Sequence, residues 1–203
     1  MTRQNEKPEI VRKLVIFSDI CSSTAIVEDL KASDNLANWL NFLITMKVNL
    51  IEWGGKIGLE MYKFVGDGWI LLGPHDIDRN DLFDFLHSFF CFLDMGLDGE
   101  NINNLLARRP EPMGLTFGID SGDLIKLEMN EQIEYVGRPL NMAARLQGAA
   151  KQFCQGYGAA GLISKSAYAQ MRGNADPSII RLQPVSIPLK HISGGNEIDC
   201  WRW

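Results

Sequence analysis

The chain has 203 residues, of which 46% are hydrophobic, so it is long enough and apolar enough to bury the core of one globular domain. Its 25 acidic residues outnumber its 20 lysines and arginines, which gives a formal net charge of −5. Because the sequence also has no local basic patch, binding to nucleic acid or to an anionic membrane is not expected.

Cysteine usage and the chain ends indicate the compartment. Cys21, Cys91, Cys154 and Cys200 lie far apart, without a Cys-x-x-Cys pair, so free thiols are expected rather than a zinc site or a disulfide framework. Residues 1–10 form a polar leader without the apolar segment of a signal peptide, and no stretch is long enough to cross a bilayer. No repeat or linker divides residues 11–203, which predicts a single soluble, cytoplasmic domain.

The first half of the chain predicts a strand, a long helical segment and a hairpin. Residues 14–17 form a short apolar run that ends at Ser18-Asp19, as a buried strand would at a polar rim. Apolar residues with helical spacing from 36 to 51 predict one long helix, or two in succession, ending before Gly54-Gly55. Residues 61–72 predict a β-hairpin around the tight turn Gly66-Asp67-Gly68.

The second half predicts further helices and strands in alternation. An amphipathic helix is expected over 81–97, and strands over 113–119 and 132–136 with a polar connection between them. Pro139 suits the first turn of a helix that runs to Ala150. A short strand at 161–163, a helix at 164–171 and a final strand with Trp201 and Trp203 on one face follow. This order predicts an α/β (α+β) sandwich, with helices packed on a mixed sheet.

Three polar features carry candidate chemistry. If the hairpin lies beside the first strand, Asp19 and Asp67 reach the same edge of the sheet, where two carboxylates can hold Mg²⁺ or Mn²⁺. Ser22, Ser23 and Thr24 can cap a helix N-terminus whose N–H groups would cradle phosphate. Asn141 and Arg145 are four residues apart and share one helix face, where they can orient a sugar and neutralise a phosphate. Each feature alone is common: an Asp in a turn, an N-cap cluster or a solvated surface pair.

Their combination resembles a known family. Four motifs, Phe17-Ser18-Asp19-Ile20, Lys63-Phe64-Val65-Gly66-Asp67-Gly68, Gly118-Ile119-Asp120-Ser121-Gly122 and Gly137-x-x-x-Asn141-x-Ala143-Ala144-Arg145-Leu146, resemble in order and spacing the class III nucleotidyl cyclase catalytic domain, with its ferredoxin-like fold. The resemblance runs from about Leu14 to the C-terminus. Four ordered motifs are far more specific than any one of them.

The resemblance implies a mechanism and a set of site residues. The family's metal-binding positions fall on Asp19, Ile20 and Asp67, which implies two divalent cations, Mg²⁺ or Mn²⁺, that activate the ribose 3′-hydroxyl and steady the triphosphate. Asn141 matches the residue that orients the ribose and Arg145 the one that stabilises charge on the α-phosphate. Lys190 resembles the family's phosphate-binding lysine, although His191 replaces the glycine that usually follows it. The family's sites are shared between two subunits, so a homodimer is implied.

The base pocket is expected at Lys63 and Glu134, which match the family's base-reading positions. Guanylate-forming members typically carry Glu and Cys there, so GTP is disfavoured. A Lys donor and a Glu acceptor suit adenine, cytosine and uracil alike. Glu134 is one methylene longer than the usual Asp, which shortens the pocket, and the chain has no sensor or membrane segment. Both features resemble the stand-alone pyrimidine cyclases of bacterial Pycsar anti-phage defence, which make cyclic UMP or cyclic CMP for a separate effector.

Two alternatives stay open at this point. One is an adenylate cyclase that makes cyclic AMP, and the other is an inactive cyclase-like nucleotide-binding module. Keeping Asp19, Asp67, Asn141 and Arg145 together argues against the inactive module, because facing carboxylates are costly unless they are used. The loop from Asp123 to Glu131 lacks the glycine-rich sequence common in adenylate cyclases, so the dimer and the base pocket can differ there.

Overall fold

The fold was determined as a computed structural model that describes residues 8–192 and 195–203. Eight strands form one mixed sheet: β1 (Glu9–Cys21), β2 (Glu60–Val65), β3 (Gly68–Pro74), β4 (Met113–Met129), β5 (Gln132–Val136), β6 (Tyr157–Ser164), β7 (Gln183–Ile192) and β8 (Gly195–Arg202). The helices are α1 (Ser23–Ala32), α2 (Leu36–Lys56), α3 (Arg79–Gly99), α4 (Ile102–Leu105), α5 (Arg138–Ala150) and α6 (Lys165–Gln170), with a 3₁₀ turn, η1 (Lys151–Phe153).

The strand order places the first strand inside the sheet, between β3 and β4. The order is β2-β3-β1-β4-β6-β8-β7, with β5 paired to β4 beside this path. Strand β1 is antiparallel to both β3 and β4, whereas β4 and β6 are parallel. The predicted hairpin therefore lies directly beside β1, and the predicted mixed α/β sandwich is confirmed. None of the described helices combines the length and the apolar character needed to cross a lipid bilayer.

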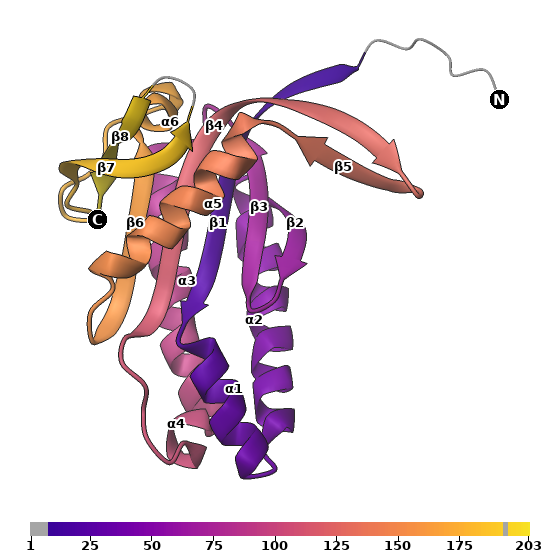
Figure 1. The fold of residues 1–203 in the computed structure, drawn as a ribbon, viewed down its shortest axis with the longest axis vertical. Coiled ribbons are helices and arrows are strands. Elements are labelled where there is room, and N and C mark those ends of the chain that lie inside the picture. Colours follow the sequence, from indigo (N-terminus) through magenta and orange to yellow (C-terminus); the bar gives the residue numbers. More distant parts are fainter. Residues whose placement is uncertain (1–7, 193–194) are drawn as a thin grey trace.

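The helices form layers on the two faces of the sheet. Helices α2 and α3 cover one face, and α5 crosses the other (Figure 1). Side chains alternate along β1, because successive strand residues point to opposite faces: Leu14 and Ile16 enter the large core under α2 and α3, and Val15 and Phe17 pack on the α5 side. Asp19 has the same parity as Val15 and Phe17, so it belongs to the α5 side.

Helix α5 lies unusually close to strand β4. A Cβ on Gly118 would lie 2.1 Å from the carbonyl oxygen of Ala143 and from the amide nitrogen of Gln147. Only glycine allows this approach, because any side chain would collide with the helix backbone. Pro139 lies in the first turn of α5 as predicted, and Met142, Ala143 and Leu146 are buried against the sheet.

Strands β4 and β5 continue beyond the rest of the sheet as a two-stranded arm, residues 125–136 (Figure 1). The prediction of a polar connection after residue 119 was wrong, because β4 runs without interruption to Met129. The polar residues 120–123 stay in the strand because they pair with β1, and residues 125–129 pair with β5. The arm exposes five large apolar side chains: Ile125, Leu127, Met129, Ile133 and Val136.

Several element boundaries differ from the predictions. Strand β1 begins at Glu9, so part of the predicted leader belongs to the sheet. Helix α2 continues through Gly54 and Gly55 to Lys56, where Gly54 packs against Leu59. Strand β7 was not predicted, since its two prolines and mixed polarity hide a strand at the sheet edge. Trp201 and Trp203 do pack against the same core, as their spacing predicted.

Candidate active site

Asp19 lies near the end of β1, between the two neighbouring strands. It is opposite Gly68 of β3 on one side and Thr116 of β4 on the other. Its side chain is 20% exposed. A pocket of about 210 Å³ opens beside it, and its wall includes Val65 from the hairpin and Ala144 and Gln147 from α5. The carboxylate is therefore half-buried at a hollow between the hairpin and α5.

Asp67 lies at the tip of the hairpin, next to the residue that faces Asp19. Gly66 before it has a φ of +68°, a backbone conformation that favours glycine in this turn. Ser23, the first residue of α1, donates a hydrogen bond from its hydroxyl to Oδ2 of Asp67. This contact joins the start of α1 to the hairpin tip, so the β1–α1 junction and the hairpin lie together.

The two carboxylates are close enough to interact electrostatically. Burial raises the pKa of Asp19, and the negative charge of Asp67 raises it further. A hydrogen bond from Lys151 acts in the opposite direction but does not cancel these effects. The Nζ of Lys151 lies 2.6 Å from Oδ2 of Asp19. A divalent cation bound in addition to the Lys151 ammonium would reduce the remaining repulsion between Asp19 and Asp67.

The donor set suits a hard divalent cation. The described residues contain no group of three or more His, Cys, Asp or Glu side chains that could enclose a metal. Two carboxylates are nevertheless the set that Mg²⁺ commonly uses in proteins, where substrate phosphates and water complete the coordination. Ile20, the third predicted metal position, follows Asp19 in β1 and its side chain is buried in the core, so only its backbone could take part.

The serine and threonine cluster after β1 is arranged differently from a simple N-cap. Ser22 has left-handed backbone angles and makes no side-chain cap bond. Its hydroxyl instead donates to the carbonyl oxygen of Pro112 at 2.7 Å. Ser23 is buried and bonded to Asp67, and Thr24 is exposed. The predicted phosphate cradle therefore has Thr24 and the α1 backbone as its accessible parts.

Lys63 and Glu134 meet in the structure, although they are far apart in the sequence. Nζ of Lys63 lies 2.5 Å from Oε2 of Glu134, whose side chain is 18% exposed. The hydrogen bond from Lys63 lowers the pKa of Glu134, and the same bond raises the pKa of Lys63. Both groups are therefore charged at neutral pH. The family resemblance predicted that both residues belong to one base pocket, and in the structure the Lys63 ammonium contacts the Glu134 carboxylate directly.

Tyr62 is a third member of this group, which the sequence analysis missed. Its hydroxyl donates to Oε2 of Glu134 at 2.5 Å and accepts a hydrogen bond from the backbone N–H of Tyr135 at 2.9 Å. Consecutive strand residues normally point to opposite faces. Here the pairing of β2 with β3 shifts register between Met61 and Lys63, and this irregularity lets Tyr62 and Lys63 reach the same carboxylate.

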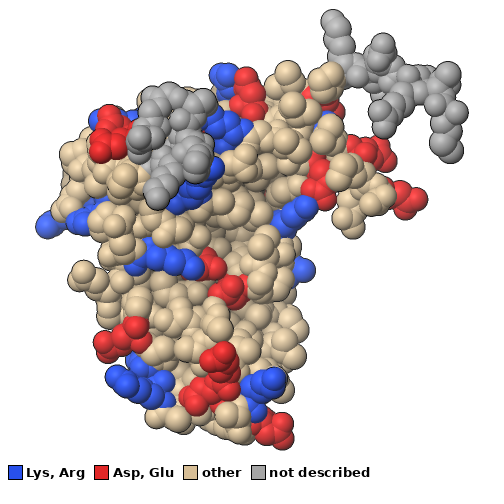
Figure 2. All heavy atoms as spheres, viewed as in Figure 1, with Lys and Arg blue, Asp and Glu red and all other residues tan. Residues whose placement is uncertain are grey.

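Asn141 and Arg145 lie on the exposed side of α5. The two side chains therefore share an exposed face, as predicted. Ala144 and Gln147, by contrast, line the pocket beside Asp19. Lys190 is in β7, but its side chain lies outside the described residues. Figure 2 shows acidic and basic side chains interspersed over one face of the molecule, without a large patch of either sign.

Comparisons with known proteins identify the fold. No protein-family model matches the chain, and no curated protein matches it. Among solved structures, a bacterial light-regulated adenylyl cyclase is similar with a TM-score of 0.67 at 13% identity, over 97% of this chain and 52% of that one. The chain thus spans about half the length of that cyclase.

Two shorter solved structures are similar over nearly their whole length. The adenylyl cyclase CyaB from P. aeruginosa has a TM-score of 0.64 at 18% identity, covering 97% of this chain and 95% of that one. The guanylyl cyclase Cya2 has a TM-score of 0.64 at 17% identity, covering 96% and 92%. The protein therefore has the fold of class III adenylyl and guanylyl cyclase catalytic domains.

Proposed function

We propose that the protein is a nucleotidyl cyclase, which converts a nucleoside triphosphate into the 3′,5′-cyclic monophosphate and pyrophosphate. The single observation that carries this proposal is the meeting of Asp19 and Asp67 at one end of the sheet, within this fold. The two aspartates would hold Mg²⁺ or Mn²⁺ ions. Such ions supply charge neutralisation on the triphosphate and lower the pKa of the ribose 3′-hydroxyl.

The chain's own residues would position the substrate for this reaction. The 3′-oxygen forms a bond to the α-phosphorus while the bond to the pyrophosphate oxygen breaks, so catalysis depends on alignment and charge stabilisation. Asn141 would orient the ribose, and Arg145 would neutralise charge that develops on the α-phosphate. Thr24 and the first backbone N–H groups of α1 would bind the outer phosphates.

The active form would be a homodimer with shared sites. At 3.6 residues per turn, the direction of Ala144 and Gln147 differs from that of Asn141 and Arg145 by roughly 110° around α5. Asn141 and Arg145 therefore point away, on average, from the Asp19 pocket of their own copy, and they would serve the aspartates of a second copy. The exposed apolar side chains of the β4–β5 arm support this assembly, because such surfaces usually mark protein contacts.

The base would be a pyrimidine, with UTP or CTP as substrate. Lys63 and Tyr62 both bind Oε2 of Glu134, so the longer carboxylate is fixed in the pocket and cannot fold back from the base. Its other oxygen, Oε1, would accept from the N–H of cytosine or uracil. Cyclic UMP or cyclic CMP would then act as a messenger to a separate effector, as in antiviral defence. ATP is the second candidate, because the polarity of this pair also suits adenine.

The test is to incubate the purified protein with Mn²⁺ and ATP, GTP, CTP or UTP separately, and to identify the products by mass. We expect a cyclic pyrimidine nucleotide and pyrophosphate. The Asp19→Asn, Asp67→Asn double variant is the control and should make no product while keeping its fold by circular dichroism. Conversion of ATP alone would overturn the pyrimidine preference, and no conversion of any nucleotide would overturn the cyclase assignment.

A further inference from the structure

Lys151 occupies a position at the candidate metal site that the sequence did not indicate. It is the first residue of η1, immediately after α5. Its Nζ lies 2.6 Å from Oδ2 of Asp19, and its side chain is 52% exposed. Asp67 also contributes an attractive interaction with this ammonium group. A single positive charge therefore contacts one of the carboxylates that would hold metal and is attracted by the other.

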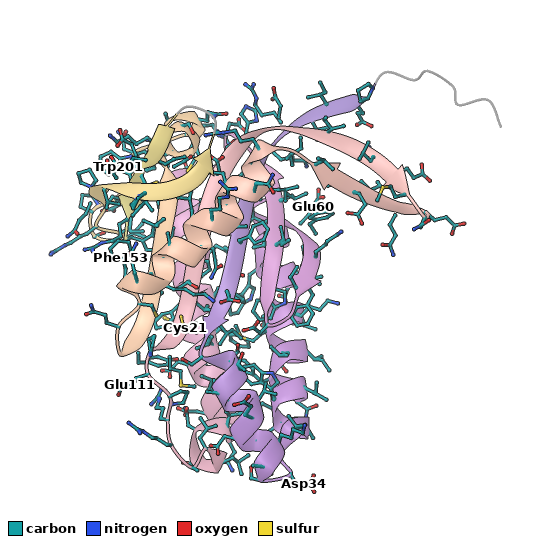
Figure 3. The ribbon with its side chains drawn as sticks, viewed as in Figure 1. Cys21, Asp34, Glu60, Glu111, Phe153 and Trp201 are labelled. Carbon is teal, nitrogen blue, oxygen red and sulfur yellow. The ribbon has the colours of Figure 1, made fainter. Side chains whose placement is uncertain are left out.

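The backbone that carries Lys151 is fastened to the end of β1 from two sides. One turn earlier, Nε2 of Gln147 donates to Oγ1 of Thr116 at 2.8 Å, and that hydroxyl donates in turn to the backbone oxygen of Asp19 at 3.3 Å. Three residues later, the buried thiol of Cys154 lies 3.4 Å from that of Cys21, which ends β1 and is labelled in Figure 3. The backbone of Lys151 is thus held near Asp19 on both sides, while its side chain stays half exposed.

We propose that Lys151 is a resident counter-ion that competes with a divalent cation for Asp19, and that it binds the nucleotide phosphates once the cation displaces it. This inference rests on the proposed metal site. The ammonium lies within hydrogen-bond distance of the carboxylate oxygen that a cation would bind, so the two cannot use that oxygen together. Because half of the Lys151 side chain is exposed, the ammonium can leave Asp19 without unpacking the core.

Competition of this kind couples the binding of metal and nucleotide. Without nucleotide, a cation must replace an existing ion pair, so metal alone binds weakly. With nucleotide, the displaced ammonium pairs with the triphosphate instead, and this new ion pair offsets the free energy lost when the Lys151–Asp19 pair breaks. Removing the charge of Lys151 should therefore have opposite effects on the two ligands: metal alone binds more tightly, and phosphate binds more weakly.

The test measures binding directly in Lys151→Met, which keeps an unbranched side chain one atom shorter but loses the charge, and in Lys151→Arg, which keeps the charge. Lys165→Met is the matched control, because Lys165 pairs with Asp199 at 3.1 Å and has a similar exposure of 48%, away from this site. Mn²⁺ binding is measured by the electron paramagnetic resonance signal of the free ion. Inorganic tripolyphosphate binding is then measured by calorimetry at saturating Mn²⁺.

We expect Lys151→Met to bind Mn²⁺ alone about fivefold more tightly, the size of effect of a partly exposed ion pair, and to lose about fivefold or more in tripolyphosphate affinity. Lys151→Arg and Lys165→Met should resemble the unmodified protein. Unchanged or weaker Mn²⁺ binding by Lys151→Met overturns the competition, and unchanged tripolyphosphate binding overturns the phosphate role. If Asp19→Asn leaves Mn²⁺ binding intact, the proposed metal site itself is wrong, which separates that failure from one confined to Lys151.

Discussion

Gly68 faces Asp19 across β3 and β1, and a Cβ on Gly68 would lie 2.2 Å from the carbonyl oxygen of Ser18. The hairpin can lie this close to β1 only because residue 68 has no side chain. Since Asp67 is its neighbour in the chain, this close approach also sets the separation of the two aspartates.

Gly68→Ala should therefore push the hairpin tip away from β1. We expect a loss of about 1–3 kcal/mol in the free energy of unfolding, measured by urea denaturation, together with weaker Mn²⁺ binding. Gly55→Ala in α2 is the control, since a Cβ there meets nothing within 4 Å and alanine favours a helix. Equal stability of the two variants would contradict the close-approach argument.

A mixture of two inactive variants tests the shared site. Asp67→Ala lacks a metal carboxylate and Arg145→Ala lacks the phosphate contact, so each homodimer should be inactive. Random exchange makes half of the dimers mixed, each with one complete site, so about a quarter of the original rate should return. An Asp67→Ala, Arg145→Ala double variant mixed with either single variant should stay inactive. Activity that never returns in the first mixture would exclude shared sites.

Tyr62→Phe tests the group that holds Glu134. The variant removes the hydroxyl that bonds both Glu134 and the N–H of Tyr135. A lost hydrogen bond of this kind costs about 1 kcal/mol, so KM for the preferred nucleotide should rise roughly fivefold, with a smaller change in kcat. Tyr168→Phe is the control, because the Tyr168 ring packs on Trp201 away from the site. A change in kcat alone would argue against a role in base binding.

Asp120 gives a prediction on pH and stability. Its side chain is fully buried, with Oδ2 3.8 Å from Arg138 and Oδ1 accepting a hydrogen bond from Ser164 at 2.5 Å. Burial raises the pKa of Asp120 above its ordinary value of 3.8. The folded state therefore holds this proton more tightly than the unfolded state, so the contribution to stability falls as the pH rises from 3.8 through the raised pKa.

Asp120→Asn removes this titration. The unfolding free energy of the variant relative to the unmodified protein should therefore increase over the same pH range, as measured by urea denaturation at several pH values. Ser186→Ala is the control. It removes a hydrogen bond from Ser186 to the exposed carboxylate of Asp199, so its effect on the unfolding free energy should not follow the pH dependence expected for Asp120→Asn. A difference between Asp120→Asn and the unmodified protein that does not vary with pH would show that the Asp120 carboxyl is not shifted.

The four thiols should differ sharply in reactivity. Cys91 is exposed, whereas Cys21, Cys154 and Cys200 are buried. Burial raises the pKa of Cys21 to about 12, with a contribution from Cys154, and raises the pKa of Cys200 to about 12. Because the thiolate is the reactive form, iodoacetamide should modify one thiol quickly in the folded protein and all four in urea. Rapid modification of more than one thiol, identified by peptide mass, would contradict this burial.

Periodicity and turn chemistry predicted the parts of the fold that are encoded locally. The Asp-Gly turn predicted the hairpin, the apolar spacing predicted α2 and α3, and Pro139 in a first helical turn predicted α5. The full length of β4 was not predictable in this way, because the polar residues 120–123 interrupt the apolar pattern and are held in the strand by pairing with β1. Strand β7 and the first residues of β1 depend on the same long-range pairing.

The site residues divide in the same way, into those that local motifs indicated and those that only the folded chain brings into place. Asp19, Asp67 and Lys63 were found within motifs, and Glu134 by its match to a base-reading position of the family. In the structure Lys63 contacts Glu134, and the charge of Asp67 acts on Asp19. Lys151 and Tyr62 belong to no such motif: one follows the end of a helix, and the other shares a carboxylate with Lys63 only because of a shift in strand register. A basic residue directly after the Asn and Arg helix was the one available signal for Lys151.

The uninterrupted course of β4 has a mechanical consequence. Thr116, near one end of the strand, faces Asp19, and Leu127, near the other end, pairs with Glu134 on the arm. If the proposed homodimer forms through the arm, a rotation of one copy against the other would move the arm, and the continuous strand would carry that movement to Asp19. In that dimer, a change in the orientation of the two copies would alter the proposed cyclase reaction without any contact with the nucleotide.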